Sequence, residues 1–183
     1  MKKTVKPVTA KYLQNAAAFY LERYPTTAEG LRRVLTRRVR RAEMLDAPVV
    51  DNVKQVIDAI VARFVDAGVI DDKAFAQTKA RALHRRGTST SLMRRKLQMA
   101  GVDGATLDKA MVGLDEELHA DPRRREWTAA VALARRRRLG PFRLKERKEH
   151  RARDLAAMAR GGFDYQLARK VIDAVDLDAL DGA

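Results

Sequence analysis

The sequence repeats itself, and this repetition restricts the possible fold more than any other feature. Residues 24–35 (YPTTAEGLRRVL) align without a gap with residues 86–97 (RGTSTSLMRRKL). A second alignment places residues 100–114 (AGVDGATLDKAMVGL) over residues 161–175 (GGFDYQLARKVIDAV). Such repeats are typical of chains that stack one supersecondary unit on the next. We therefore expect three successive units of the same architecture.

Apolar residues recur at the three- and four-residue spacing that marks one face of a helix. The clearest sets are Leu31, Leu35 and Val39, then Val53, Val56, Ile57, Ile60, Val61 and Phe64, and then Leu167, Val171, Ile172 and Val175. Strand-like alternation is hard to find, and the chain has only 5 prolines and 10 glycines. These patterns predict helices throughout the chain.

Together, the repeats and the spacing predict an all-α fold, an elongated solenoid of three tandem three-helix repeats. The first repeat is expected over residues 10–68, with a long connection between its second and third helices. The second repeat is expected over 69–119 and the third over 120–178. Residues 1–9 and 179–183 are expected to be flexible termini.

Several predicted helices begin after an aspartate, which can accept hydrogen bonds from the free amides of the first turn. These aspartates, each preceded by a bulky apolar residue, are Asp51, Asp71, Asp103 and Asp164. For the second helix of the first two repeats, the expected caps are Thr26 with Glu29, and Thr88 or Ser89. The acidic pair Asp71-Asp72 has the composition of a catalytic pair, but capping is the simpler interpretation.

Residues 70–102 (IDDKAFAQTKARALHRRGTSTSLMRRKLQMAGV) resemble the central repeat of the RecX family, the bacterial regulators of the recombinase RecA. The shared pattern is an apolar residue, two acidic residues, Phe-Ala, a basic helix, glycine, and a basic helix closed by Gly-Val. Residues 155–175 resemble that family's third repeat, and the resemblance covers roughly residues 10–176. The first and third repeats depart from the second by extra residues within 39–50 and 140–153.

The resemblance implies a protein that binds along the groove of the RecA–single-stranded-DNA filament. There it would hinder recombinase activity or filament growth, and so act in the regulation of DNA repair and the SOS response. We therefore expect the RecA filament as the partner, with single-stranded DNA contacted directly or through the filament. We also expect a cytoplasmic monomer.

Charge alternates in sign along the repeats, and the chain as a whole carries +14. Residues 23–41 carry seven basic and one acidic side chain, and residues 79–96 carry seven basic and no acidic ones. Residues 121–153 carry thirteen basic and four acidic side chains. The other segments are acidic: residues 42–72 carry two basic and seven acidic side chains, and residues 97–120 carry one basic and five acidic ones. Residues 171–183 carry four acidic side chains and no basic one. If the repeats stack in register, their first and second helices form a basic stripe suited to a polyanionic partner.

The candidate partner-binding or nucleic-acid-binding residues come from this stripe. They are Arg32, Arg33, Arg94, Arg95, Lys96, Arg135, Arg136, Arg137 and Arg138. The run of four arginines is expected to end a helix, with Gly140 closing it as Gly87 closes its counterpart. Four consecutive residues cover most of a helical turn, so at most two or three of them face one ligand. For each residue, a solvated helix face is the simpler alternative.

A helix-turn-helix DNA-binding protein is the alternative function. Residues 92–114 (LMRRKLQMAGVDGATLDKAMVGL) have the length of that motif, whose second helix enters the major groove. The second helix here carries Asp108, Asp115, Glu116 and Glu117 against Lys109 alone. DNA phosphates would repel these carboxylates, which argues against this function.

No pattern in the sequence predicts an enzyme, a cofactor or a metal site. The chain has no cysteine, and His84, His119 and His150 have no metal-ligand spacing, so each is expected at the surface. A phosphate-binding GxxxxGK[ST] motif is absent. Trp127 and Phe142 adjoin basic residues and could stack on a base, although packing between repeats is the simpler role. The sequence has no apolar run long enough to span a bilayer.

Overall fold

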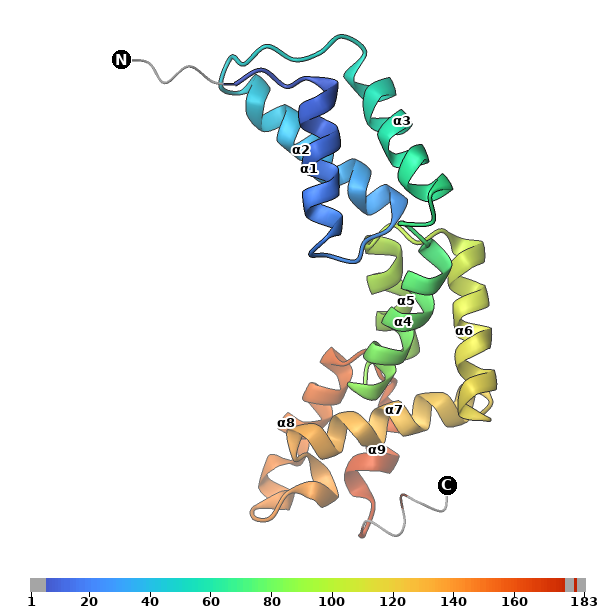
Figure 1. Ribbon diagram of the computed structural model, residues 1–183. Coiled ribbons are helices and arrows are strands. Elements are labelled where there is room, and N and C mark those ends of the chain that lie inside the picture. The colour runs from blue at the N-terminus through green and yellow to red at the C-terminus, as the bar shows by residue number, and fades with distance from the viewer. Residues whose placement is uncertain (1–5, 177–179, 181–183) are drawn as a thin grey trace. The chain divides into compact units, whose positions relative to one another are not determined.

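The computed structural model describes residues 6–176 and residue 180. Within this part of the chain, regular secondary structure consists of α-helices and one short 3-10 helix (Figure 1). The helices are α1 (Ala10–Leu21), α2 (Ala28–Glu43), α3 (Val53–Asp66), α4 (Asp72–Arg85), α5 (Thr90–Met99), α6 (Gly104–Leu118), α7 (Pro122–Arg137), η1 (Gly140–Phe142), α8 (Arg147–Arg160) and α9 (Tyr165–Asp173). The predicted all-α fold is confirmed.

Most of the two termini that were predicted to be flexible lies outside the described residues. Val8 is described, and it is buried. Its amide donates to the carbonyl of Pro48 at 2.8 Å, and its carbonyl accepts from the amide of Val50 at 2.9 Å. This short parallel bridge ties the start of α1 to the long connection between α2 and α3.

The chain divides into two compact units. Unit 1 comprises residues 1–75 with 100–103, and unit 2 comprises 76–99 with 104–183, as far as these are described. Helix α4 belongs to both, because the division falls within it. The repeat boundaries given above remain predictions.

Unit 1 has an aliphatic core between α1, α2 and α3. Leu31, Leu35 and Val39 are spaced four residues apart on α2, so they share one face, and all three are buried. Ile57 and Val61 of α3 pack into the same cluster. Burying each such side chain contributes about 1.5–3 kcal/mol, which is why α2 folds despite its six arginines.

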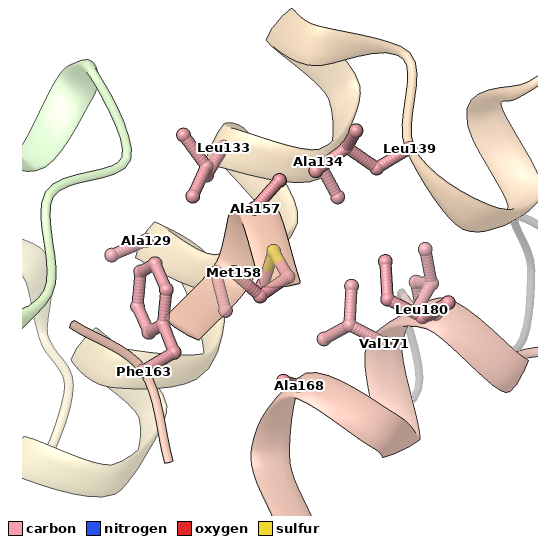
Figure 2. Close-up of a cluster of buried hydrophobic side chains, with 12 residues drawn as sticks. Ala129, Leu133, Ala134, Leu139, Ala157, Met158, Phe163, Ala168, Val171 and Leu180 are labelled. Atoms are coloured by element: carbon pink, nitrogen blue, oxygen red, sulfur yellow. The ribbon is translucent and has the colours of Figure 1, made fainter. Parts of the chain in front are cut away.

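Unit 2 has a second core, formed largely by α7, α8 and α9. Figure 2 shows Leu133 of α7, Met158 of α8 and Val171 of α9 within this cluster, with Phe163 from the turn between α8 and α9. Many of the side chains that α7 contributes are alanines, which bring the helix backbones close together.

The aspartate caps are confirmed for Asp71 and Asp164, each of which directly precedes its helix. Asp71 accepts from the amides of Lys73 and Ala74, each at 2.9 Å. Asp164 accepts from the amide of Leu167 at 2.9 Å. Asp72, the other member of the acidic pair, accepts from the amide of Ala28 at 2.9 Å and so satisfies the start of α2. Both acidic residues bind backbone, as the capping interpretation predicted.

Two predicted caps are wrong by one residue. Thr27 caps α2 instead of Thr26, with its hydroxyl accepting from the amide of Gly30 at 2.9 Å. Helix α3 begins after Asn52, which has a left-handed backbone (φ 54°) and makes no side-chain cap bond. Asp51 therefore lies one position too early to cap this helix, because a capping side chain reaches only the second and third amides of its own helix.

The glycine turns that precede α6 and α9 pack against aligned residues in the two units. Gly101 packs against Thr27 in unit 1, and the Thr27 hydroxyl donates to the carbonyl of Ala100 at 2.6 Å. Gly162 packs against Ser89 in unit 2, and Ser91 Oγ donates to its carbonyl at 3.2 Å. The sequence alignments pair Thr27 with Ser89, so the repeats share this junction as well as their helices.

Candidate partner-binding surface

The predicted contacts of the first repeat, Arg32 and Arg33, lie on α2, and both have carboxylate partners. Arg32 Nε lies 2.9 Å from Asp58 Oδ1 of α3. Arg33 Nε lies 2.9 Å from Glu29 Oε1, one turn earlier on the same helix. These side chains are partly exposed, so each pair contributes only about 0.2–1 kcal/mol.

A groove of about 630 Å³ lies between α2 and α3, and both arginines border it. Its apolar part includes Val39 and Ile57. Its basic lining also includes Arg37, Arg40 and Lys54, which form no ion pair with any residue that the structure describes. These cations are free to meet an anionic partner.

The sequence analysis did not select Arg37 and Arg40 as binding residues. The signal was present, because Arg33, Arg37 and Arg40 follow each other at four and three residues and so share a helix face. Selection by alignment between repeats missed them, because the aligned positions of the second repeat are Met99, the last residue of α5, and Val102, and neither is basic.

The predicted contacts of the second repeat, Arg94, Arg95 and Lys96, lie on α5 and differ from one another. Arg94 forms an ion pair with Asp108 of α6. Arg95 and Lys96 are exposed and form no ion pair within the described part of the chain. Of the three, these two have the charges that are available to a partner.

The arginine run belongs to a folded element, as predicted, and all four of its side chains are exposed. The predicted stop at Gly140 is wrong: α7 ends at Arg137, and Arg138 takes the left-handed conformation (φ 54°) that closes it. Arg135 lies over the ring of Phe142, with its guanidinium carbon 5.5 Å from the ring centroid. Buried Asp154 accepts from the amide of Gly140 at 2.9 Å and holds the turn that follows.

The alternation of charge has a structural explanation within the repeats. In each of them, a second-helix arginine pairs with a third-helix aspartate: Arg32 with Asp58, Arg94 with Asp108, and Arg151 with Asp173. The last pair is bidentate, with both distances 2.7 Å, and the hydrogen bond from Arg151 holds the pKa of Asp173 below its ordinary value. Opposite charges on neighbouring helices therefore stabilise each repeat, and the basic side chains outside these pairs are the ones that can bind a partner.

The histidines belong to no group of side chains that could hold a metal ion in the described part of the chain. The prediction that all of them lie at the surface is wrong for His84, which is buried on α4. Its Nε2 lies 3.5 Å from the hydroxyl of Thr128 on α7. Buried Arg125 is part of the same cluster and forms an ion pair with Asp115 of α6.

The carboxylates of α6 are less available to repel DNA than their number indicates. Asp108, Asp115 and Glu117 each form an ion pair with an arginine of unit 2.

No helix that the structure describes is long and apolar enough to cross a membrane.

Comparison with known proteins shows similarity to one family along most of the chain. The family model described as "RecX, second three-helix domain" matches residues 71–111. A Regulatory protein RecX from Myxococcus xanthus (strain DK1622) is 39% identical over 174 residues, which cover 94% of this chain and 90% of that protein. A Regulatory protein RecX from Agrobacterium fabrum is 29% identical, covering 93% of this chain and 86% of that protein.

Solved structures share the fold. The crystal structure of RecX from Lactobacillus salivarius matches with a TM-score of 0.60 at 18% identity, covering 95% of this chain and 97% of that chain. A second crystal structure, of a regulatory protein RecX, matches with a TM-score of 0.52 over 90% of this chain and 73% of that chain.

Proposed function

Because the chain belongs to the RecX family, we propose that it is a non-enzymatic regulator of RecA in the cytoplasm. It binds the RecA–single-stranded-DNA filament through basic side chains of α2, α5 and α7, and inhibits the recombinase and the DNA repair that depends on it. Its partner is a protein filament, and single-stranded DNA is contacted through or alongside that filament.

The observation that carries this proposal is the set of exposed cations outside the ion pairs. On α2, α5 and α7 this set includes Arg37 and Arg40 of the groove, and Arg95, Lys96, Arg135, Arg136, Arg137 and Arg138. A repetitive anionic partner can engage such residues on several helices at once. Each exposed pair contributes only about 0.2–1 kcal/mol, so the affinity must come from many contacts together.

Inhibition follows from this mode of binding. A chain held by many weak contacts along a filament covers several protomers and hinders the addition or rearrangement of each. No covalent step is required, so the regulator needs neither a nucleophile nor a cofactor.

Co-sedimentation with RecA filaments on single-stranded DNA tests the proposal. The variant Arg95→Glu with Lys96→Glu reverses two unpaired charges and leaves Arg94 facing Asp108. We expect binding to fall tenfold or more, about 1.4 kcal/mol. Thermal stability should stay nearly unchanged, because exposed substitutions usually alter it by no more than about 0.5 kcal/mol.

The matched control is Arg63→Glu with Lys109→Glu, which changes the net charge equally on the third helices of two repeats. Both of these side chains are exposed, and neither forms an ion pair within the described residues. An equal loss of binding in the control would show that net charge alone matters. Sedimentation with bare single-stranded DNA as strong as with the filament would instead favour a general DNA-binding protein.

A further inference from the structure

Trp127 is the only tryptophan of the chain, and it is held in one orientation on α7. Its indole Nε1 donates to the carbonyl of Leu180 at 3.1 Å. The ring also packs against the core cluster of unit 2. Leu180 belongs to this cluster and is labelled in Figure 2. The side chain is nevertheless only partly buried. A fixed aromatic ring with some surface left open is what a stacking contact needs, because little entropy is lost on binding.

Two hollows border the indole. One, of about 310 Å³, is lined by Arg124, Arg135 and Val131 among others. The other, of about 570 Å³, lies between the starts of α7 and α9, and its lining includes Arg123 and Lys170. The ring thus lies between two basic hollows.

The cations of these hollows are unpaired, whereas the acidic residues are engaged. Among the described residues, Arg123, Arg124, Arg135 and Lys170 form no ion pair. Two carboxylates line the larger hollow, and both act as helix caps: Asp121 accepts from the amide of Arg124 at 2.8 Å, and Asp164 caps α9. Capping does not neutralise these carboxylates, but the larger hollow has three cations against two carboxylates and the smaller one has cations alone, so the net charge on both sides of the ring is positive.

We propose that Trp127 and these four cations form a subsite for single-stranded DNA, in which one base stacks on the indole and adjoining phosphates bind in the two basic hollows. An aromatic platform flanked by a basic path is the arrangement that binds single strands without sequence preference. The inference goes beyond the proposed function, because it concerns direct binding of DNA and requires no recombinase.

The emission of Trp127 reports on this site directly, since the protein has no other tryptophan. The full-length chain is titrated at low salt with an oligothymidylate and with an abasic oligonucleotide of the same length. We expect the oligothymidylate to quench the emission and to bind about tenfold more tightly than the abasic strand, because stacking adds to the shared phosphate contacts. Unchanged emission at saturation, or equal affinity for the two strands, would overturn the proposal.

Substitutions separate stacking from packing. Trp127→Phe keeps an aromatic face and should retain most of the affinity for a labelled oligothymidylate, whereas Trp127→Leu should lose about tenfold while its helical circular dichroism is kept. If Trp127→Leu binds as tightly as the unmodified protein, the subsite does not exist. The titration of the unmodified chain decides the question even if this variant does not fold.

The charge contribution has its own pair of variants. Arg123→Gln with Lys170→Gln should weaken oligothymidylate binding about tenfold, whereas Arg63→Gln with Lys109→Gln removes the same charge elsewhere and should have little effect. Equal losses in both variants would contradict a site at Trp127. Because RecA is absent from every arm, failure here leaves the proposed filament binding standing, and failure of filament binding leaves this site standing.

Discussion

His84 illustrates how a single residue depends on neighbours that are distant in sequence. It is buried beside α7, and burial, followed by the charge of Arg125, lowers its pKa below the ordinary value of 6.5. Glu126 and Asp115 oppose this shift without cancelling it. The folded protein therefore holds His84 neutral at a pH at which the unfolded chain is already protonated.

This difference predicts how stability depends on pH. Below pH about 6.5 the unfolded state binds more protons than the folded state, so the free energy of unfolding should fall as the pH is lowered from about 7.5 to about 5.5. Urea unfolding at a series of pH values measures this slope. His84→Gln cannot titrate and should flatten it, whereas His119→Gln, at an exposed histidine, should keep it. A slope that is the same in all three proteins would contradict a buried neutral His84.

At the scale of helices, the junction between a glycine turn and a capping hydroxyl recurs in the two units. Gly162 has a left-handed backbone (φ 84°), and a β-carbon there would lie 2.3 Å from Ser89 Oγ. The amide of Thr90, at the start of α5, donates to Glu126 at 2.8 Å, much as the amide of Ala28 donates to Asp72. Helix starts are thus satisfied by carboxylates from other helices, as well as by their own caps.

Three glycine variants measure what this junction contributes. Gly162→Ala should lower the free energy of unfolding by more than about 2 kcal/mol, for two reasons. The new side chain strains a left-handed backbone, and its β-carbon clashes with Ser89 Oγ. Gly68→Ala has the strain alone (φ 69°), with no atom within 4 Å of the added carbon, and should cost about 1 kcal/mol. Gly113→Ala, within α6 and also without neighbours, should stabilise by about 0.5–1 kcal/mol. Denaturant unfolding measures the free energy of unfolding of the three variants. Equal losses for Gly162→Ala and Gly68→Ala would show that Ser89 moves away from the added β-carbon at no measurable cost.

At the scale of the whole molecule, the net charge of +14 combines two populations of side chains. Some arginines are used inside the repeats, as in the pairs of Arg32, Arg94 and Arg151 with aspartates of the neighbouring helix. Others, among them exposed arginines of α2, α5 and α7, form no ion pair within the described residues and are the ones proposed above to bind the filament. We expect only the exposed arginines outside the ion pairs to form contacts with a partner.

Filament binding should therefore weaken steeply as salt rises. Between about 0.1 M and about 1 M salt the Debye length falls from about 10 Å to about 3 Å, which screens exposed charges much more than buried contacts. Co-sedimentation across this range measures the loss, and circular dichroism over the same range should show unchanged helicity. Binding that persists at high salt would mean that apolar contacts, such as those available in the α2–α3 groove, carry most of the affinity.

Local patterns in the sequence were sufficient to predict the all-α fold and several of the helix caps. The spacing of Leu31, Leu35 and Val39 specifies a buried helix face regardless of what covers it. Asp71 and Asp164 cap helices only a few residues away, and the arginine run continues the helix that precedes it. These features could be predicted because the interactions that create them lie within one or two turns of the chain.

Tertiary structure decided which charges are paired and which are available. Arg94 and Arg95 are adjacent and chemically identical, yet Arg94 pairs with Asp108 and Arg95 is exposed, because only one of them points toward α6. In the same way, His84 is buried and Asp72 caps a helix 44 residues away because segments distant in sequence pack against them. The sequence determines which side chains are charged, but the packing of the helices determines which of them meet. Adjacent helical positions point about 100° apart, so two neighbouring arginines face different surroundings.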